Sequence, residues 1–219
     1  MSAADASGTR VAGHFHDAGQ QREAAVLGMW AFLATEVMFF GGLFAGYLLL
    51  RLSDPTGFAA AAGNLDLWFG ALNTAVLLAS SYTVALAVHA IQAGRARRSA
   101  WLLAASAALG LFFLVIKGLE YAEKIEHGLV PGLLWHPQEA LGDIGQLFFF
   151  LYFVMTGLHG VHVVIGIGLL AWVAANAARG RYGADSHDAV ECVGLYWHFV
   201  DLVWIYLFPL FYLIGAGFS

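Results

Sequence analysis

Long apolar runs dominate the pattern of hydrophobic and polar positions along this chain. Five such runs alternate with short polar segments, and each is long enough to cross the hydrocarbon core of a bilayer as a helix. They are too long and too continuously apolar for barrel strands, whose side chains alternate in polarity. The predicted spans are residues 24–52, 67–91, 100–122, 144–178 and 189–218. The pattern therefore predicts an all-α, polytopic transmembrane helical bundle over residues 24–219, preceded by a polar tail over residues 1–23.

Composition narrows the functional classes. Of 219 residues, 60% are hydrophobic and only 11% are charged, whereas about a quarter of the residues of a soluble domain are charged. The net charge is -5 and the basic residues are scattered, which gives no support for a nucleic-acid partner. Cys192 is the single cysteine, so a disulfide framework and a cysteine-based metal site are excluded.

The basic residues predict the orientation of the bundle. Cytoplasmic loops of membrane proteins carry an excess of Lys and Arg. If the five spans are correct, seven of the ten basic residues fall on the side of the N-terminal tail, namely Arg10, Arg22, Arg95, Arg97, Arg98, Arg179 and Arg181. The other side has Arg51, Lys117 and Lys124. We therefore expect the N-terminus in the cytoplasm and the C-terminus outside.

Glu36 lies near the middle of the first predicted span. An ionisable side chain at such a position costs roughly 2.5–3.5 kcal/mol on insertion scales. No basic residue lies one turn away on the same helix, so its partner must come from another helix or from water. Glu36 is then either a protonated carboxyl hydrogen-bonded inside the bundle, or a group that exchanges protons or anchors a lipid or a partner helix.

Two histidines lie three residues apart in the fourth predicted span. His159 and His162 share a helix face at this spacing. They could ligate a metal or haem, but a closed site needs further ligands from other spans, for which His89 and His198 are candidates. The alternative is a pair of buried histidines hydrogen-bonded to neighbouring groups.

The fifth predicted span carries a stripe of ionisable residues. Glu191 and His198 are seven residues apart, two turns along one face, and His198 and Asp201 are spaced to form a hydrogen-bonded pair. Pairing removes most of the cost of burying either one alone. The stripe is either a polar clasp that fixes helix packing or a proton relay, and the spacing does not decide between them.

Basic residues near the ends of two spans suggest contacts at the membrane surface. Lys117 can reach Glu120 and Tyr121, and Glu120 can pair with Lys124 one turn further on. These residues predict an interfacial cluster with snorkelling lysines at the end of the third span. Arg179 and Arg181 could hold anionic lipid headgroups, although the orientation rule alone also predicts arginines there.

At these residues the chain resembles subunit III of the haem-copper terminal oxidases, in its short five-span form. The similarity runs through all five spans. Thr35 stands where the family usually has serine, and Lys117 where glutamine is expected. The segments that carry the resemblance are Ala-Thr-Glu-Val-Met-Phe-Phe at 34–40, Leu-Asn-Thr with Leu-Leu-Ala-Ser-Ser at 72–81, Thr-Gly-Leu-His-Gly-Val-His at 156–162, and Tyr-Trp-His-Phe-Val-Asp at 196–201.

The resemblance implies an accessory role in the bacterial plasma membrane, without catalytic residues or a metal in this chain. Haem and copper are expected in the partner subunits, and subunits I and II, membrane phospholipid and a cytochrome bc-type supercomplex are the implied partners. Glu36 matches the buried glutamate of the family, which is associated with proton uptake. His159, His162, Glu191, His198 and Asp201 are then a structural polar network.

Several alternatives stay open on the sequence alone. Within the family they are the third subunit of a quinol oxidase and a homologue associated with nitric oxide reductases. Outside it they are a free-standing haem- or metal-binding membrane protein, which would use the histidines above, and a transporter.

Overall fold

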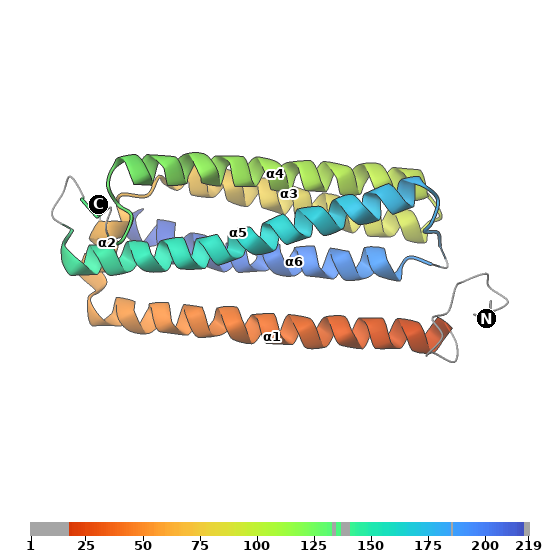
Figure 1. The fold of residues 1–219 in the computed structure, drawn as a ribbon, viewed down its shortest axis with the longest axis horizontal. Coiled ribbons are helices and arrows are strands. Elements are labelled where there is room, and N and C mark those ends of the chain that lie inside the picture. Colours follow the sequence, from red (N-terminus) through yellow and green to blue (C-terminus); the bar gives the residue numbers. More distant parts are fainter. Residues whose placement is uncertain (1–17, 133–134, 137–140, 185, 217–219) are drawn as a thin grey trace.

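Five long helices make up most of the chain in the computed structural model, which describes residues 18–132, 135–136, 141–184 and 186–216 (Figure 1). The long helices are α1 (Ala18–Ser53), α3 (Leu67–Gln92), α4 (Ala96–Glu126), α5 (Gly142–Ala178) and α6 (Asp188–Phe208). Shorter elements are α2 (Pro55–Ala62), a π-helical turn η1 (Pro209–Leu213) and α7 (Ile214–Ala216). Within the described ranges there is no strand beyond two isolated bridges.

The predicted all-α fold is confirmed. Five helices are long and apolar enough to cross a membrane, in the predicted order. The helix α1 already begins within the predicted tail, at Ala18, while residues 1–17 of that tail lie outside the described residues.

The short helix α2 was not predicted and follows from local capping. Asp54 is its N-cap residue, and its Oδ1 accepts a hydrogen bond of 2.9 Å from the backbone N–H of Gly57. Pro55 occupies the first helical position, where its missing N–H costs nothing. The helix is held by burial, because Phe58 is fully buried against Tyr47 and Phe148.

The last span is not one uniform helix. A single helix over 189–218 was expected. Instead, α6 ends at Phe208, and the backbone hydrogen bonds from Pro209 onward are those of the π-helical turn η1. Proline has no N–H and its ring clashes with the carbonyl one turn earlier, so the regular α-helical ladder cannot continue through it. The predicted residues 217–219 are outside the described part.

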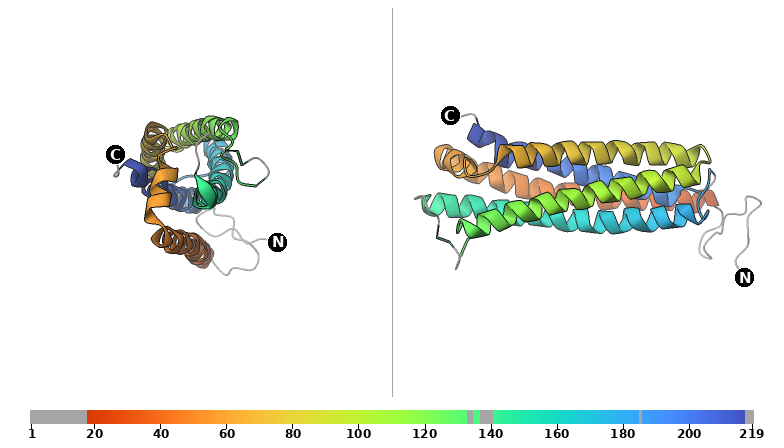
Figure 2. Two further views of the ribbon diagram at one scale, coloured as in Figure 1. Left: turned by 90° about the vertical axis from the view of Figure 1, so that its left-hand side faces the viewer. Right: turned by 90° about the horizontal axis from the view of Figure 1, so that it is seen from above.

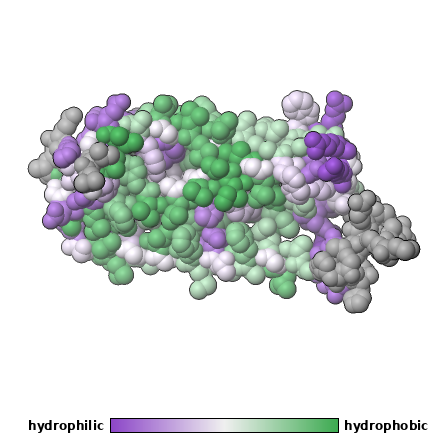
Figure 3. Space-filling view, in the orientation of Figure 1, coloured by the Kyte–Doolittle hydropathy of each residue, from purple (hydrophilic) through white to green (hydrophobic). Residues whose placement is uncertain are grey.

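Helices α3, α4, α5 and α6 form a bundle, and α1 lies apart along one side (Figures 1 and 2). The bundle interior is filled by Trp197 and Trp204 of α6, both fully buried. Trp197 fits because two glycines face it: a Cβ would lie 2.6 Å from its ring at Gly110 and 2.7 Å from it at Gly166. Apolar side chains form a band between polar ends on the surface (Figure 3), as a lipid-facing surface requires.

The arginines of the predicted cytoplasmic side gather at one end of the bundle. The start of α1, the α3–α4 connection and the α5–α6 connection all lie at that end (Figure 1). They carry Arg22, Arg95, Arg97, Arg98, Arg179 and Arg181. Arg10 lies outside the described residues. The charge asymmetry behind the predicted orientation is therefore present along the bundle, and we call this the arginine-rich end.

Candidate functional site

Glu36 finds its partner on another helix, as its sequence context requires. Its Oε2 lies 3.1 Å from Nε2 of His162 on α5, and the side chains are 19% and 16% exposed. The ring of Phe40, one turn further along α1, stands edge-on to His162 with centroids 5.2 Å apart. The pair joins α1 to the bundle at mid-span.

The hydrogen bonds of His162 determine how many protons this pair holds. Its Nδ1 lies 2.8 Å from the carbonyl oxygen of Leu158. A carbonyl can only accept, so Nδ1 carries a proton, and Nε2 of a neutral imidazole then carries none. The hydrogen bond to Glu36 therefore contains one proton, which sits either on a neutral carboxyl or on an imidazolium that faces a carboxylate.

Polar contacts fasten α1 near both of its ends as well as at Glu36. At the arginine-rich end, Arg22 Nε lies 3.1 Å from Asp188 Oδ1, and its Nη2 lies 3.3 Å from Glu191 Oε2. Toward the other end, the Tyr47 hydroxyl donates to the carbonyl oxygen of Leu210. Between these points, a Cβ added at Gly42 or Gly46 would meet no atom of another described element within 4 Å. No described helix of this chain makes the close approach that these glycines permit.

A polar cluster around Lys117 and Glu120 is buried in the bundle, where the sequence predicted an interfacial one. Lys117 and Glu120 of α4 have side chains 8% and 0% exposed, and Nζ lies 3.1 Å from Oε2. Nζ also donates to the hydroxyl of Tyr152 at 2.8 Å and to that of Tyr212 at 2.9 Å. Both hydroxyls donate to Glu120 Oε1, at 2.9 and 2.6 Å. All three ammonium protons and both carboxylate oxygens are thus used.

The predicted contact between Lys117 and Glu120 is confirmed, but the prediction of exposed, snorkelling lysines is wrong. Lys117 lies more than two turns before the end of α4 at Glu126, and its ammonium group is enclosed by tyrosines of other elements. Lys124 does not bond Glu120; its Nζ lies 2.9 Å from Glu123. An i,i+3 pair of opposite charges inside an apolar run was the available signal, but the tyrosines that complete the cluster come from α5 and η1.

The two histidines of α5 face different surroundings. His159 is 1% exposed and lies between Phe113 and Trp204, with no hydrogen-bond partner for either ring nitrogen among the described side chains. His162 points to α1. His89 is exposed, and His198 bonds Ser81 on α3. Across the described ranges, no three His, Cys, Asp or Glu side chains gather as metal ligands would.

The stripe on α6 divides into two parts. Glu191 belongs to the arginine-rich end, where it bonds Arg22, Gln92 at 2.7 Å and His187 at 3.0 Å. His198 does not form the predicted direct bond to Asp201. Its Nδ1 lies 2.7 Å from Ser81 Oγ instead.

Asp201 is 3% exposed, and neither carboxylate oxygen has a partner in hydrogen-bond geometry in the described chain. The facing helix α3 supplies the Ser81 hydroxyl as the partner of His198, so the carboxyl of Asp201, one turn further along α6, stays unpaired among the described side chains.

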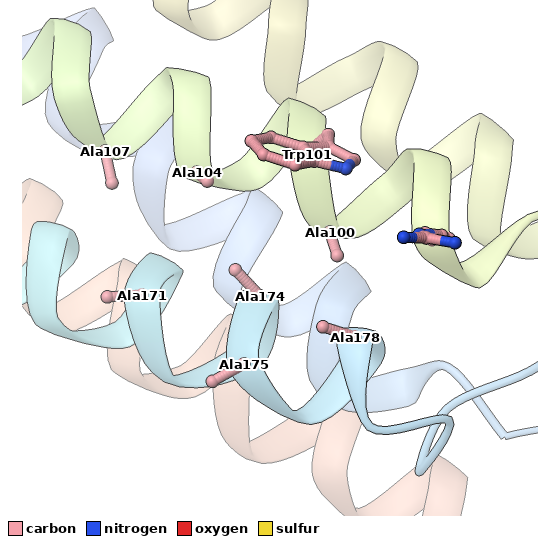
Figure 4. A pocket seen from close by; sticks show the side chains of 9 residues that line it. Ala100, Trp101, Ala104, Ala107, Ala171, Ala174, Ala175 and Ala178 are labelled. Atoms are coloured by element: carbon pink, nitrogen blue, oxygen red, sulfur yellow. The ribbon is translucent and has the colours of Figure 1, made fainter.

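A groove runs between α4 and α5 near the arginine-rich end. Its volume is about 760 Å³, and alanines of both helices line it (Figure 4). Arg97 and Trp101 also line it. Among the predicted headgroup contacts, Arg179 is exposed, and Arg181 donates to Asn176 Oδ1 at 3.0 Å. The alanines are Ala100, Ala104, Ala107, Ala171, Ala174, Ala175 and Ala178.

Comparison with known proteins gives one consistent family. The family described as "Cytochrome c oxidase subunit III" matches residues 7–216. A cytochrome c oxidase subunit 3 of Thermostichus vulcanus is 34% identical over 212 residues, which cover 96% of both chains. The protein of the same name from Gadus morhua is 35% identical over 86% of this chain and 69% of its own length. A probable quinol oxidase subunit 3 of Staphylococcus epidermidis is 32% identical over 88% of this chain and 90% of its own.

Proposed function

Because the chain belongs to the cytochrome c oxidase subunit III family, we propose that it is the non-catalytic subunit III of a proton-pumping respiratory cytochrome c oxidase. As a subunit of an oxidase it works with other oxidase subunits, and we assign these as subunits I and II. Haem and copper reside in those partners, where oxygen is reduced. The chain supports proton uptake and the stability of the complex, in a bacterial inner membrane with its arginine-rich end in the cytoplasm.

The observation that carries this proposal is the Glu36–His162 pair. A carboxyl and an imidazole that share one proton at 3.1 Å are neutral together, so the pair can hold an exchangeable proton in the membrane without an unpaired charge. Such a pair suits a group that buffers protons for a neighbouring catalytic subunit. It does not supply an electron-transfer centre.

The open face of α1 supports packing against a partner. Gly42 and Gly46 form a small-xxx-small pair, a pattern that lets membrane helices approach closely, and no described element of this chain covers it. We assign this face to a helix of subunit I. Contact with a cytochrome bc-type complex would use other surfaces of the assembled oxidase.

The alanine groove supports binding of a phospholipid. An apolar groove of about 760 Å³ between α4 and α5 accommodates an acyl chain, and Arg97 in its lining can pair with a phosphate. Arg179, exposed at the end of α5, supplies a further positive charge at the same end.

A quinol oxidase is the second candidate for the whole complex. The similarity to the Staphylococcus epidermidis protein favours it, since that relative aligns over nearly its full length. A homologue associated with nitric oxide reductase is a third member of the same group. In all three cases this chain keeps an accessory role, and the complexes differ in electron donor or in the substrate that is reduced.

Purification of the tagged chain from its native membranes in mild detergent tests the proposal. We expect the larger oxidase subunits to co-purify, and the complex to consume oxygen with reduced cytochrome c as donor. Activity with quinol alone would select the second candidate. A haem Soret band in the chain purified without partners, lost in His159→Ala, would overturn the accessory role, as would ion conduction by the chain reconstituted alone.

A further inference from the structure

A second groove lies between α3 and α6 and leads inward from the arginine-rich end. It has a volume of about 360 Å³ and is lined by Ala85 and Val88 of α3 and by Glu191, Gly194, Leu195 and His198 of α6. Glu191 and His198 are seven residues apart, about 10 Å along the helix axis. Gly194 leaves the groove open between them, since a Cβ there would lie 3.3 Å from Val88 and 3.4 Å from Val84.

The imidazole of His198 connects this groove to the bundle interior. His198 is part of the groove lining, and its Nδ1 lies 2.7 Å from Ser81 Oγ. Since Nδ1 is engaged with Ser81, the nitrogen left for water in the groove is Nε2. A histidine whose Nε2 faces the groove and whose Nδ1 faces the bundle interior can take up a proton at Nε2 and release one from Nδ1.

Asp201 lies at the inner end of this connection. Its carboxyl group is buried without a hydrogen-bond partner among the described residues, and it lies one turn along α6 from His198. An ionised carboxylate in such a place would be very costly, so the group holds its proton. Beyond Asp201, the indole N–H groups of Trp197 and Trp204 bond Ser80 and Thr74 of α3, and these two rings fill the interior on either side.

We propose that Glu191, the groove, His198 and Ser81 form a proton-exchange path between the arginine-rich end and Asp201, which stores one proton. When a proton reaches Nε2 of His198, Nδ1 passes its own proton to Ser81, and the hydroxyl proton of Ser81 moves to an ionised Asp201. The reverse sequence releases it, and a change of imidazole tautomer resets the path. One proton enters for each one stored, and the path ends at Asp201 without crossing the membrane.

The ionisable groups around the mouth of the path are paired with one another. Glu191 there faces Arg22 of α1 and His187 of its own helix, and Asp188 pairs with the same arginine. Gln92 of α3 donates to Glu191. At the inner end, the ring of Trp204 is in contact with two further ionisable groups, His159 of α5 and Lys117 of α4.

Infrared hydrogen–deuterium exchange of the Asp201 carboxyl tests this path. The chain is purified with its native partners and placed in lipid nanodiscs, and the carbonyl band of protonated Asp201 is identified by its loss in Asp201→Asn. On transfer to D₂O, we expect Ser81→Ala to slow the shift of this band by about 100-fold, at the lower end of what a positioned proton-transfer group contributes. Thr83→Val is the matched control, because that α3 hydroxyl bonds Ser106 and lies off the path.

A second variant keeps the test decisive if Ser81→Ala does not fold. Ala85 is exposed on the groove wall, so Ala85→Leu fills the groove without touching a polar group, and it should slow the same exchange. Exchange at the wild-type rate in a folded Ser81→Ala or Ala85→Leu protein would overturn the proposal, as would the absence of any carbonyl band that depends on Asp201. The measurement reads this chain directly, so its result is independent of which oxidase the chain serves.

Discussion

Glu36 Oε2 on α1 and His162 Nε2 on α5 lie 3.1 Å apart, and the two groups are 126 residues apart in the sequence. The hydrogen bond from His162 Nδ1 to the Leu158 carbonyl leaves one proton for the pair. This contact also fastens the middle of α1, whose ends are held by Arg22 and Tyr47. The pair therefore couples a protonation site to the attachment of α1.

Removing the imidazole of His162 should lower the stability of the complex more than neutralising Glu36 does. Glu36→Gln keeps an amide that can bond His162, so assembly and initial turnover of the oxidase should stay close to wild type. His162→Phe leaves the carboxyl of Glu36 without its partner, which costs about 1–3 kcal/mol. Thermal inactivation of the purified complex should show the difference. Loss of oxygen reduction at the first turnover in fully assembled Glu36→Gln complex would contradict the accessory role.

The Lys117–Glu120 cluster should behave as a unit. Lys117→Met strands a buried carboxylate and should lower the free energy of unfolding by about 3–5 kcal/mol, whereas Lys117→Met with Glu120→Leu should recover much of the loss. Unfolding titrations in mixed micelles measure both.

Lys124→Met is the matched comparison for this cluster, because its partner Glu123 is 39% exposed and can be hydrated once unpaired. It should therefore cost less than Lys117→Met. An additive double variant would show that the two charges do not stabilise one another.

The space for Trp197 should be sensitive to a single methyl group. Gly166→Ala places a Cβ about 2.7 Å from the indole ring, and overpacking of this kind costs about 1–3 kcal/mol. Gly168→Ala, two residues along α5, meets nothing within 4 Å and should be neutral or stabilising by up to about 1 kcal/mol. Thermal unfolding of both variants compares them, and equal midpoints would show that the helices move apart without cost.

Filling the alanine groove should displace a bound phospholipid. Ala104→Leu with Ala171→Leu occupies the space between α4 and α5, and mass spectrometry of the purified complex should then find less phospholipid per chain. Ala75→Leu with Ala79→Leu adds the same bulk to the exposed side of α3 and should leave the lipid content unchanged. If both pairs retain the wild-type content, the groove is not a lipid site.

The N-cap of α2 should weaken in acid. Hydrogen bonds from the Gly57 backbone N–H and the Thr56 side chain hold the pKa of Asp54 below its ordinary value of 3.8. A lowered pKa stabilises the folded state above the unfolded value, and this contribution is lost as the pH falls through the folded value. Protease cleavage near residue 57 should therefore increase at pH values below about 3.8. Asp54→Ala should show the higher cleavage already at neutral pH, with no further increase from this group.

The sequence by itself determined the five spans, their order and the charge difference between the two ends, because the length of an apolar run and the position of an arginine are local properties of the chain. It also identified Glu36, His162 and Asp201 as side chains that need explaining. The tertiary structure decided how they are arranged: Glu36 with His162, Lys117 with tyrosines of α5 and η1, and His198 with Ser81 rather than with Asp201. These partners lie on different helices, and Trp197 and Trp204 of α6 pack against α3, α4 and α5 in the orientation that brings the partners together. A membrane helix that is apolar on all sides has no single buried face, so its sequence does not specify how it is rotated about its axis.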